Sequence, residues 1–195
     1  WWDLARIAPV HNRPEAAGIE ELNAIPDDAV RIRMRSDAPF GAFLSGGVDS
    51  STIVGLMARH SADPIKTFCI GFEDPRYDEA PFAEAAARRF GTDHVMRRVD
   101  PDMLELWPKA IYHCDQPHGD ISFLPTYRVS ELAAEHVKVV LTGDGGDELF
   151  AGYEKYADFF ARPGIDELDE ESFQRRYFGS ISLFGDADKI ALIAP

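Results

Sequence analysis

The sequence is poor in positive charge. Its 195 residues include 20 Lys and Arg against 34 Asp and Glu, which gives a formal net charge of −14 at pH 7. A surface this acidic repels a phosphate backbone, which argues against nucleic acid as a partner. It also means that any bound polyphosphate needs local compensation from Mg²⁺, from backbone amides or from a helix N-terminus.

Cysteines and long apolar runs are also scarce. The two cysteines, Cys69 and Cys114, are too few for a disulfide framework or a zinc site. Cys69 lies in an apolar run and is interpreted as a core residue. Cys114 follows His113, and we interpret this pair as two residues near a helix end rather than as a nucleophile and its base. We recognise no signal peptide and no membrane-spanning stretch, so we expect a cytoplasmic protein without a membrane partner.

Candidate strands alternate with candidate helices along the chain. Strands are expected at residues 39–44, 65–72, 94–99 and 137–141, and helices at 19–35 with a break at Pro26, 50–59, 78–90, 102–113 and 126–136. This alternation predicts an α/β fold with a doubly wound, mostly parallel sheet and helices on both faces. Ligands of such sheets bind at the carboxyl ends of the strands.

The domain organisation is expected to be simple. Residues 1–18 are interpreted as a linker or edge segment, 19–153 as one α/β domain, and 154–195 as a charged, helical C-terminal segment of that domain. The sequence begins without Met and ends in what we interpret as the middle of an element. We therefore expect it to be part of a longer protein.

The first loop of interest follows the strand at 39–44 and has the sequence SGGVDS at residues 45–50. Its two glycines allow a tight turn and a close approach to a ligand, and the following helix offers free N–H groups. The loop lacks the Lys of a Walker A motif, and Asp49 would repel a phosphate unless a metal ion lay between them. The loop therefore predicts a pyrophosphate site with Mg²⁺ at Asp49. The alternative is an ordinary capped turn between a strand and a helix.

The second loop of interest follows the strand at 137–141 and has the sequence TGDGGDE at residues 142–148. Three glycines permit close approach, and three acids call for a cation. If the two preceding strands are neighbours, Asp147 faces Asp49 across the pyrophosphate and both carboxylates share Mg²⁺. The ligand spacing and terminal Glu of an EF-hand are absent.

Both loops carry a resemblance to a known family. SGGVDS resembles the SGGxDS loop of the N-type ATP pyrophosphatases, or PP-loop superfamily, whose fold is adenine nucleotide alpha hydrolase-like. The stretch LTGDGGDELFAGY resembles the corresponding segment of glutamine-hydrolysing asparagine synthetases, and the resemblance to their synthetase domain covers about residues 19–156.

The resemblance implies a role for each residue that matches its motifs. Asp144 would be catalytic and order the substrate or intermediate. The residues that would hold the pyrophosphate are Ser45, Gly46, Gly47, Asp49 and Ser50. The residues that would border the adenosine are Phe43, Ile70, Thr142 and Gly143, and the two carboxylates that would bind Mg²⁺ are those of Asp49 and Asp147.

The resemblance also implies a reaction and its partners. Mg-ATP would adenylate the β-carboxylate of aspartate with release of pyrophosphate, and ammonia from glutamine would then give asparagine and AMP. The family carries a glutaminase domain before this region, and none is found in this sequence. The family also places a catalytic Lys well beyond the second loop. Lys155 lies too close to that loop to be this residue, so the catalytic Lys is not found in this sequence either. We therefore expect this chain alone to be inactive. The oligomeric state is not fixed by the sequence, and a homodimer stays open.

Two alternatives remain. At residues 115–120 the sequence is DQPHGD, and Gln116 and His118 depart from the DEPFAD pattern common in the family. This departure favours a different acceptor, as in β-lactam synthetases and related amidotransferases. His118 is interpreted as a surface-loop histidine rather than a catalytic base. The second alternative is a nucleotide-binding module without catalysis.

Overall fold

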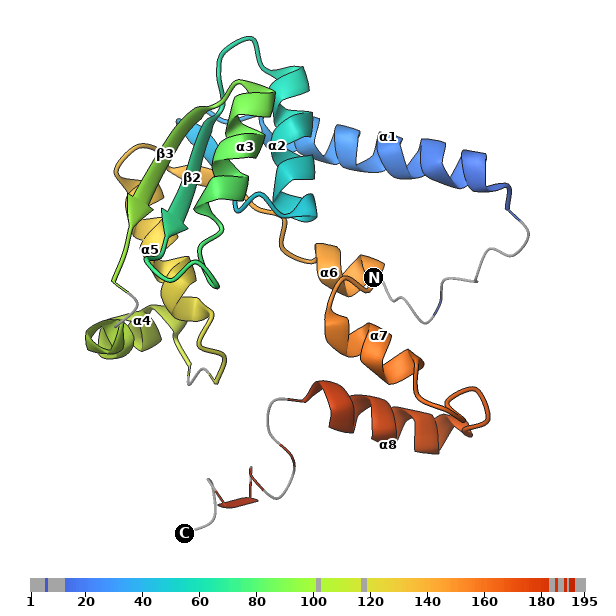
Figure 1. Cartoon of the computed structure of the whole chain (residues 1–195). Helices are drawn as coiled ribbons and strands as arrows, with labels where there is room; N and C mark the ends of the chain where they lie inside the picture. The colour runs from blue at the N-terminus through green and yellow to red at the C-terminus, as the bar shows by residue number, and fades with distance from the viewer. Residues whose placement is uncertain are drawn as a thin grey trace.

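The computed structural model describes residues 6, 13–100, 103–116, 119–182, 185, 188 and 190–191. Its centre is a four-stranded parallel sheet in the order β3-β2-β1-β4 (Figure 1). The strands are β1 (Phe40–Phe43), β2 (Lys66–Gly71), β3 (Asp93–Arg98) and β4 (Val139–Leu141). The predicted parallel α/β sheet is thereby confirmed.

Helices cover both faces of the sheet, as the alternation of elements predicted. On one face lie α1 (Glu15–Arg33), α2 (Val48–His60) and α3 (Ala80–Phe90), and on the other lies α5 (Phe123–Ala134). Successive strand residues point to opposite faces. Cys69 accordingly packs with α2 and α3, whereas its neighbour Phe68 packs against Leu132 of α5. Burial raises the pKa of the Cys69 thiol to about 12, which fits a core residue.

The three helices that differ most from the predictions, α1, α4 and α5, each contain a proline. The first helix begins at Glu15 and runs through Pro26 without the predicted break. Its second half packs on α2, where Asp27 Oδ1 lies 3.2 Å from Arg59 Nη1, an ion pair, and 3.0 Å from His60 Nε2. In α4 (Trp107–Cys114) and α5 the prolines fall in the first turn, where a missing N–H breaks no hydrogen bond. A short 3-10 turn (Leu104–Leu106) precedes α4, and the start of that predicted helix, at residue 102, lies outside the described residues.

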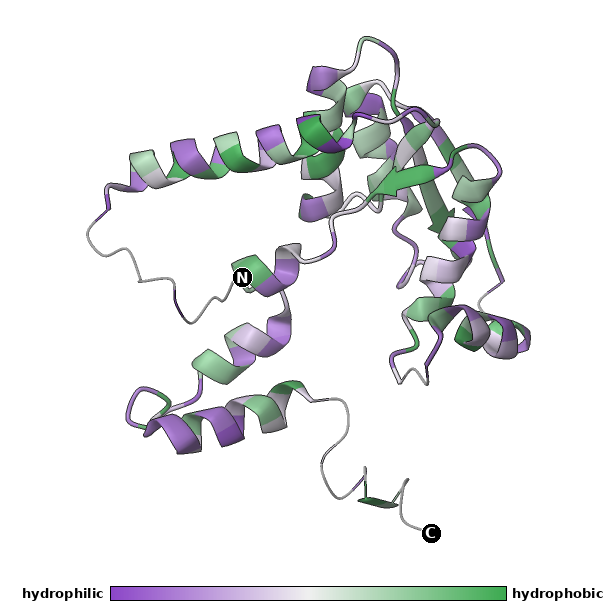
Figure 2. Ribbon diagram, turned by 180° about the vertical axis from the view of Figure 1, so that it is seen from behind, coloured by the Kyte–Doolittle hydropathy of each residue, from purple (hydrophilic) through white to green (hydrophobic). Residues whose placement is uncertain are grey.

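The C-terminal part is helical, as predicted. It contains α6 (Gly146–Phe150), α7 (Glu154–Phe160) and α8 (Glu170–Ile181), and α7 and α8 lie away from the sheet (Figure 1). Phe159 joins them, since its fully buried ring lies 5.6 Å from that of Phe173 and 5.2 Å from that of Tyr177. Figure 2 shows hydrophobic residues gathered in the sheet, whereas α1 and α8 alternate between hydrophilic and hydrophobic positions.

One buried polar cluster lies where β2 meets β3. The Thr67 side chain is fully buried, and its Oγ1 lies 2.9 Å from both Thr92 Oγ1 and His94 Nδ1. Within the described part of the chain, His94 Nε2 is buried without a hydrogen-bond partner. Burial disfavours the charged imidazolium and lowers the pKa of His94 below its ordinary value.

This histidine predicts a loss of stability in mild acid. In the unfolded chain, His94 has its ordinary pKa of about 6.5 and binds a proton below that pH. In the folded chain, the same imidazole binds a proton only at a lower pH. The stability that neutral His94 contributes is therefore present above that pH and is lost as the pH falls below it. We expect the free energy of unfolding, from urea titrations, to fall more steeply from about pH 7.5 to about pH 5.5 in the native protein than in a His94→Gln variant. Equal falls in the two proteins would contradict this assignment.

Candidate active site

The first loop turns sharply between β1 and α2. Gly46 adopts φ of 87°, a conformation that favours glycine. A Cβ atom on Gly46 would lie 2.4 Å from the carbonyl carbon of Phe82, so the first turn of α3 packs directly against this loop. Both the backbone conformation and the available space therefore require a glycine here.

Hydroxyl groups order the interior of the loop. Ser45 Oγ accepts a hydrogen bond from the Gly47 amide at 3.2 Å and lies 3.0 Å from Ser50 Oγ. Gly47 is the N-cap of α2, and no side chain caps the helix. The first-turn amides of α2 are therefore left for an anion, which the partial positive charge of a helix N-terminus attracts.

The second loop packs directly on the first. Strands β1 and β4 pair directly, with Ala42 opposite Leu141. The two loops therefore follow neighbouring strands, which was the condition for Asp147 to face Asp49. A Cβ atom on Gly143 would lie 2.7 Å from the Ser50 amide nitrogen, and one on Gly146 would lie 2.3 Å from Asp49 Cγ. The second loop can approach the Asp49 carboxylate this closely only because glycine has no side chain.

The two loops enclose a cavity of about 320 Å³, here called the acidic cavity. It is lined by Phe43, Ser45, Asp49, Ser50, Thr142, Gly143, Asp144, Gly145, Asp147, Glu148 and Tyr153. Four of these described lining residues are carboxylates, and none is Lys, Arg or His. A cavity wall with several carboxylates and no basic residue favours a bound cation.

A second cavity, of about 240 Å³ and here called the apolar cavity, adjoins the first. Phe43 and Ser45 line both cavities, and Ile70, Phe68 and Phe72 line the apolar one. The two cavities thus lie at the carboxyl end of β1, where a doubly wound sheet binds its ligands.

The structure places nearly all of the predicted site residues together. The acidic cavity is lined by eight of them, namely Phe43, Ser45, Asp49, Ser50, Thr142, Gly143, Asp144 and Asp147. Ile70 lines the apolar cavity, Gly46 packs against α3, and Gly47 caps α2. The binding and catalytic roles of these residues remain predictions.

Three residues of the cavity wall, Gly145, Glu148 and Tyr153, were given no role from the sequence, and two of them, Glu148 and Tyr153, interact with each other. The Tyr153 hydroxyl donates a hydrogen bond to Glu148 Oε1 at 2.8 Å, which raises the pKa of Tyr153 to about 12 and lowers that of Glu148. Ala151 ends α6 with φ of 54° and turns the chain so that Tyr153 returns to the cavity. Both residues lie within the motif LTGDGGDELFAGY, so the signal was present, but the turn at Ala151 was not predicted.

The donor set fits Mg²⁺ bound together with a nucleotide rather than a closed protein cage. In the described ranges, no group of three or more His, Cys, Asp or Glu is arranged to hold a metal ion. Mg²⁺ typically takes one or two carboxylates and completes its shell with water and phosphate oxygens. Asp49, which lies against Gly146, and Asp147, which lines the same cavity, are the two carboxylates that could hold such an ion.

A family model described as asparagine synthase matches residues 21–187. The chain belongs to the asparagine synthase family. It is 46% identical over 155 residues to a putative glutamine-hydrolysing asparagine synthetase 2 of Methanocaldococcus jannaschii, covering 78% of this chain and 30% of that protein. It is 40% identical over 156 residues to the glutamine-hydrolysing asparagine synthetase 1 of Bacillus subtilis, covering 79% and 24%.

A third relative has a different name. The amidase chyE of Penicillium rubens is 32% identical over 153 residues, covering 70% of this chain and 23% of that protein. The chain thus spans less than a third of the length of these curated relatives of the asparagine synthase family.

Among the described helices, none is long and apolar enough to cross a bilayer.

Gly146 provides a direct test of the site. In the intact protein, a Gly146→Ala change would push a methyl group into the Asp49 carboxylate, 2.3 Å from its Cγ, and displace it. We expect the affinity for ATP in the presence of Mg²⁺, measured by isothermal titration calorimetry, to fall by roughly tenfold or more, because small misplacements of binding groups are costly. The matched control is Gly179→Ala in α8, where a Cβ atom meets nothing within 4 Å. Equal affinities in the two variants would contradict this packing.

Proposed function

We propose that this chain is the ATP-binding synthetase part of a glutamine-dependent asparagine synthetase. Mg-ATP adenylates the β-carboxylate of aspartate and releases pyrophosphate, and ammonia then displaces AMP to give asparagine. The observation that carries this proposal is the acidic cavity, where four carboxylates without a basic residue among the described lining adjoin an uncapped helix N-terminus.

The residues of the two loops divide the handling of ATP between them. The first-turn amides of α2 and the hydroxyls of Ser45 and Ser50 receive the phosphates. Asp49 and Asp147 hold Mg²⁺, which when bound neutralises charge on the departing pyrophosphate. The apolar cavity, with Phe43 and Ile70 in its wall, takes the adenosine.

The acceptor side of the reaction involves Asp144. Its carboxylate is oriented by the Thr142 hydroxyl, which donates a hydrogen bond to Asp144 Oδ2 at 2.9 Å. We assign Asp144 to ordering the substrate or the adenylated intermediate. Ammonia comes from glutamine through an N-terminal glutaminase domain of the intact protein. We place the protein in the cytoplasm, where ATP, aspartate and glutamine meet.

A second candidate keeps the chemistry and changes the acceptor to another carboxylate. Two observations favour it: Gln116, two residues after the last residue of α4, departs from the family pattern, and a relative is named an amidase. His118, the other residue that departs from the family pattern, lies outside the described residues.

The carboxylate hypothesis predicts the effect of removing charge. In the intact protein, Asp49→Asn and Asp147→Asn should each lower the rate of pyrophosphate release by about 10²-fold or more, because each loses a ligand for the ion that neutralises the leaving group. A coupled pyrophosphate assay measures this rate. The control is Asp63→Asn at an exposed position after α2, which should release pyrophosphate at the native rate. Native rates in both site variants would contradict the metal assignment.

The acceptor is identified by substrate dependence. We expect pyrophosphate release from ATP to require aspartate, and asparagine to form when glutamine or ammonia is added. Release that is independent of aspartate but requires another carboxylate would favour the second candidate. Absence of pyrophosphate with every carboxylate tested, together with ATP binding, would indicate a non-catalytic nucleotide-binding module.

A further inference from the structure

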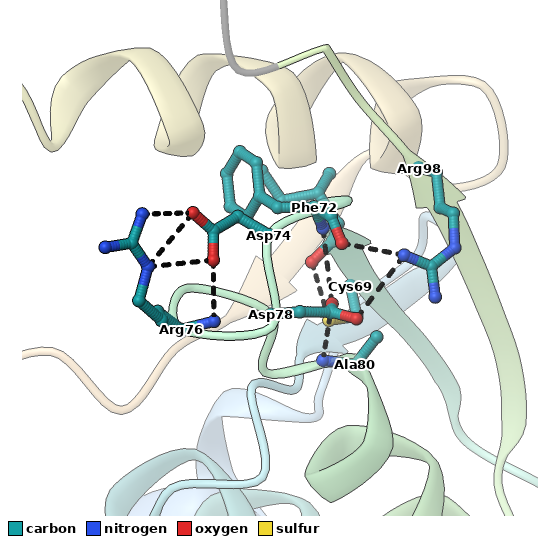
Figure 3. A network of polar contacts seen from close by, with 8 residues as sticks. Cys69, Phe72, Asp74, Arg76, Asp78, Ala80 and Arg98 are labelled. Carbon is teal, nitrogen blue, oxygen red and sulfur yellow. Dashed lines mark hydrogen bonds and ion pairs between the residues drawn. The ribbon is translucent and has the colours of Figure 1, made fainter.

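The loop between β2 and α3, residues 72–79, forms one wall of the apolar cavity. Phe72, Tyr77 and Glu79 line that cavity together with Phe43 and Ser45. Figure 3 shows that two acidic side chains organise this loop, Asp74 near its middle and Asp78 near its end. The two differ in what they connect.

Asp78 connects three elements. Its Oδ1 accepts hydrogen bonds at 3.2 Å from the backbone amides of Phe72, directly after β2, and of Ala80, the first residue of α3. Its Oδ2 lies 3.4 Å from Arg98 Nη1, at the end of β3, and the same Nη1 donates to the Phe72 carbonyl oxygen at 2.7 Å. The Asp78 side chain is only 10% exposed and that of Arg98 is 55% exposed, so solvent screens the hydrogen bonds of Asp78 weakly and its ion pair with Arg98 more strongly.

Asp74 makes its contacts within the loop. It accepts hydrogen bonds from the Arg76 guanidinium at 2.6 to 3.1 Å and from the Arg76 backbone amide at 3.0 Å. The Arg76 side chain is 78% exposed. Exposed pairs of this kind contribute little to stability, and this one links the loop only to itself.

The start of α3, which Asp78 fixes, is the surface against which the first loop packs. A Cβ atom on Gly46 would lie 2.4 Å from Phe82 C and 2.5 Å from Ala83 N, so no space separates the SGGVDS loop from the first turn of α3. A shift of α3 toward or away from the sheet therefore moves the wall behind Gly46, and with it the amides that begin α2.

We propose that Asp78 and Arg98 are positioning residues that hold the first turn of α3 against Gly46 and so keep the SGGVDS loop in the shape that receives the diphosphate of ATP. This inference rests on the proposed function for its ligand. It assigns a role to a loop that neither of the two sequence motifs includes.

Kinetics of the intact protein test the proposal. Asp78→Ala should raise the KM for ATP by roughly tenfold or more and leave the KM for the acceptor carboxylate within about twofold, since the loop and the start of α3 border the ATP side of the site and not Asp144. Asp78→Asn keeps an oxygen for the Phe72 and Ala80 amides and should raise the KM for ATP less. Arg98→Ala should also raise this KM, and Arg98→Lys should raise it less than Arg98→Ala does.

The control Asp74→Ala should keep both KM values. A variant that only lost stability would show a lower kcat at unchanged KM, and that result would overturn the proposal.

Amide hydrogen exchange decides the same question without turnover. The hydrogen-bonded amides of Ser45, Gly47 and Ser51 should exchange severalfold faster in Asp78→Asn than in the native protein, and at the native rate in Asp74→Ala. Unchanged exchange in Asp78→Asn would overturn the positioning role, whether or not the protein releases pyrophosphate. Faster exchange in a protein that releases no pyrophosphate would support the positioning role and contradict the proposed function. The milder Asn variant is used so that the result does not depend on Asp78→Ala folding.

Discussion

Contact between two glycine-rich loops is the constraint on which the rest of the site depends. Gly146 lies so close to Asp49 that a Cβ atom on it would be 2.3 Å from Asp49 Cγ, and one on Gly143 would be 2.7 Å from the Ser50 amide nitrogen. This contact places Asp49 and Asp147 on one cavity together with Asp144 and Glu148. In a chain with a net charge of −14, such a cavity is stabilised by a cation and not by a polyanion alone.

The sheet topology brings the loops together. Parallel strands end at the same edge, and the order β3-β2-β1-β4 pairs β1 directly with β4, although almost a hundred residues separate them in the sequence. The β2–β1 pairing adds the apolar cavity on the other side of the β1 end, where Phe43 and Ser45 belong to both cavities. A ligand with a charged end and a flat apolar end suits this pair of adjoining cavities.

Much of this arrangement was predictable from the sequence, because local chemistry determined it. Apolar runs followed by Gly-rich turns marked β1 and β4, and the acids of both turns marked the candidate metal ligands. What the sequence did not reveal depends on tertiary contacts. The helix that continues through Pro26 packs on α2 and buries Val30 in the core, and Tyr153 reaches the cavity because Ala151 adopts a left-handed conformation. The contact of Gly46 with α3 joins segments more than thirty residues apart, and no local pattern indicates it.

The central claim is that Asp49 and Asp147 share one Mg²⁺ at the diphosphate of ATP. The most direct measurement is a crystal structure of the intact protein with Mg²⁺ and the non-cleavable analogue α,β-methylene-ATP. We expect an ion within about 2.1 Å of an oxygen of each carboxylate and of a phosphate oxygen, with the phosphates at the first turn of α2. An ion that contacts neither carboxylate, or a nucleotide bound outside the two cavities, would contradict it.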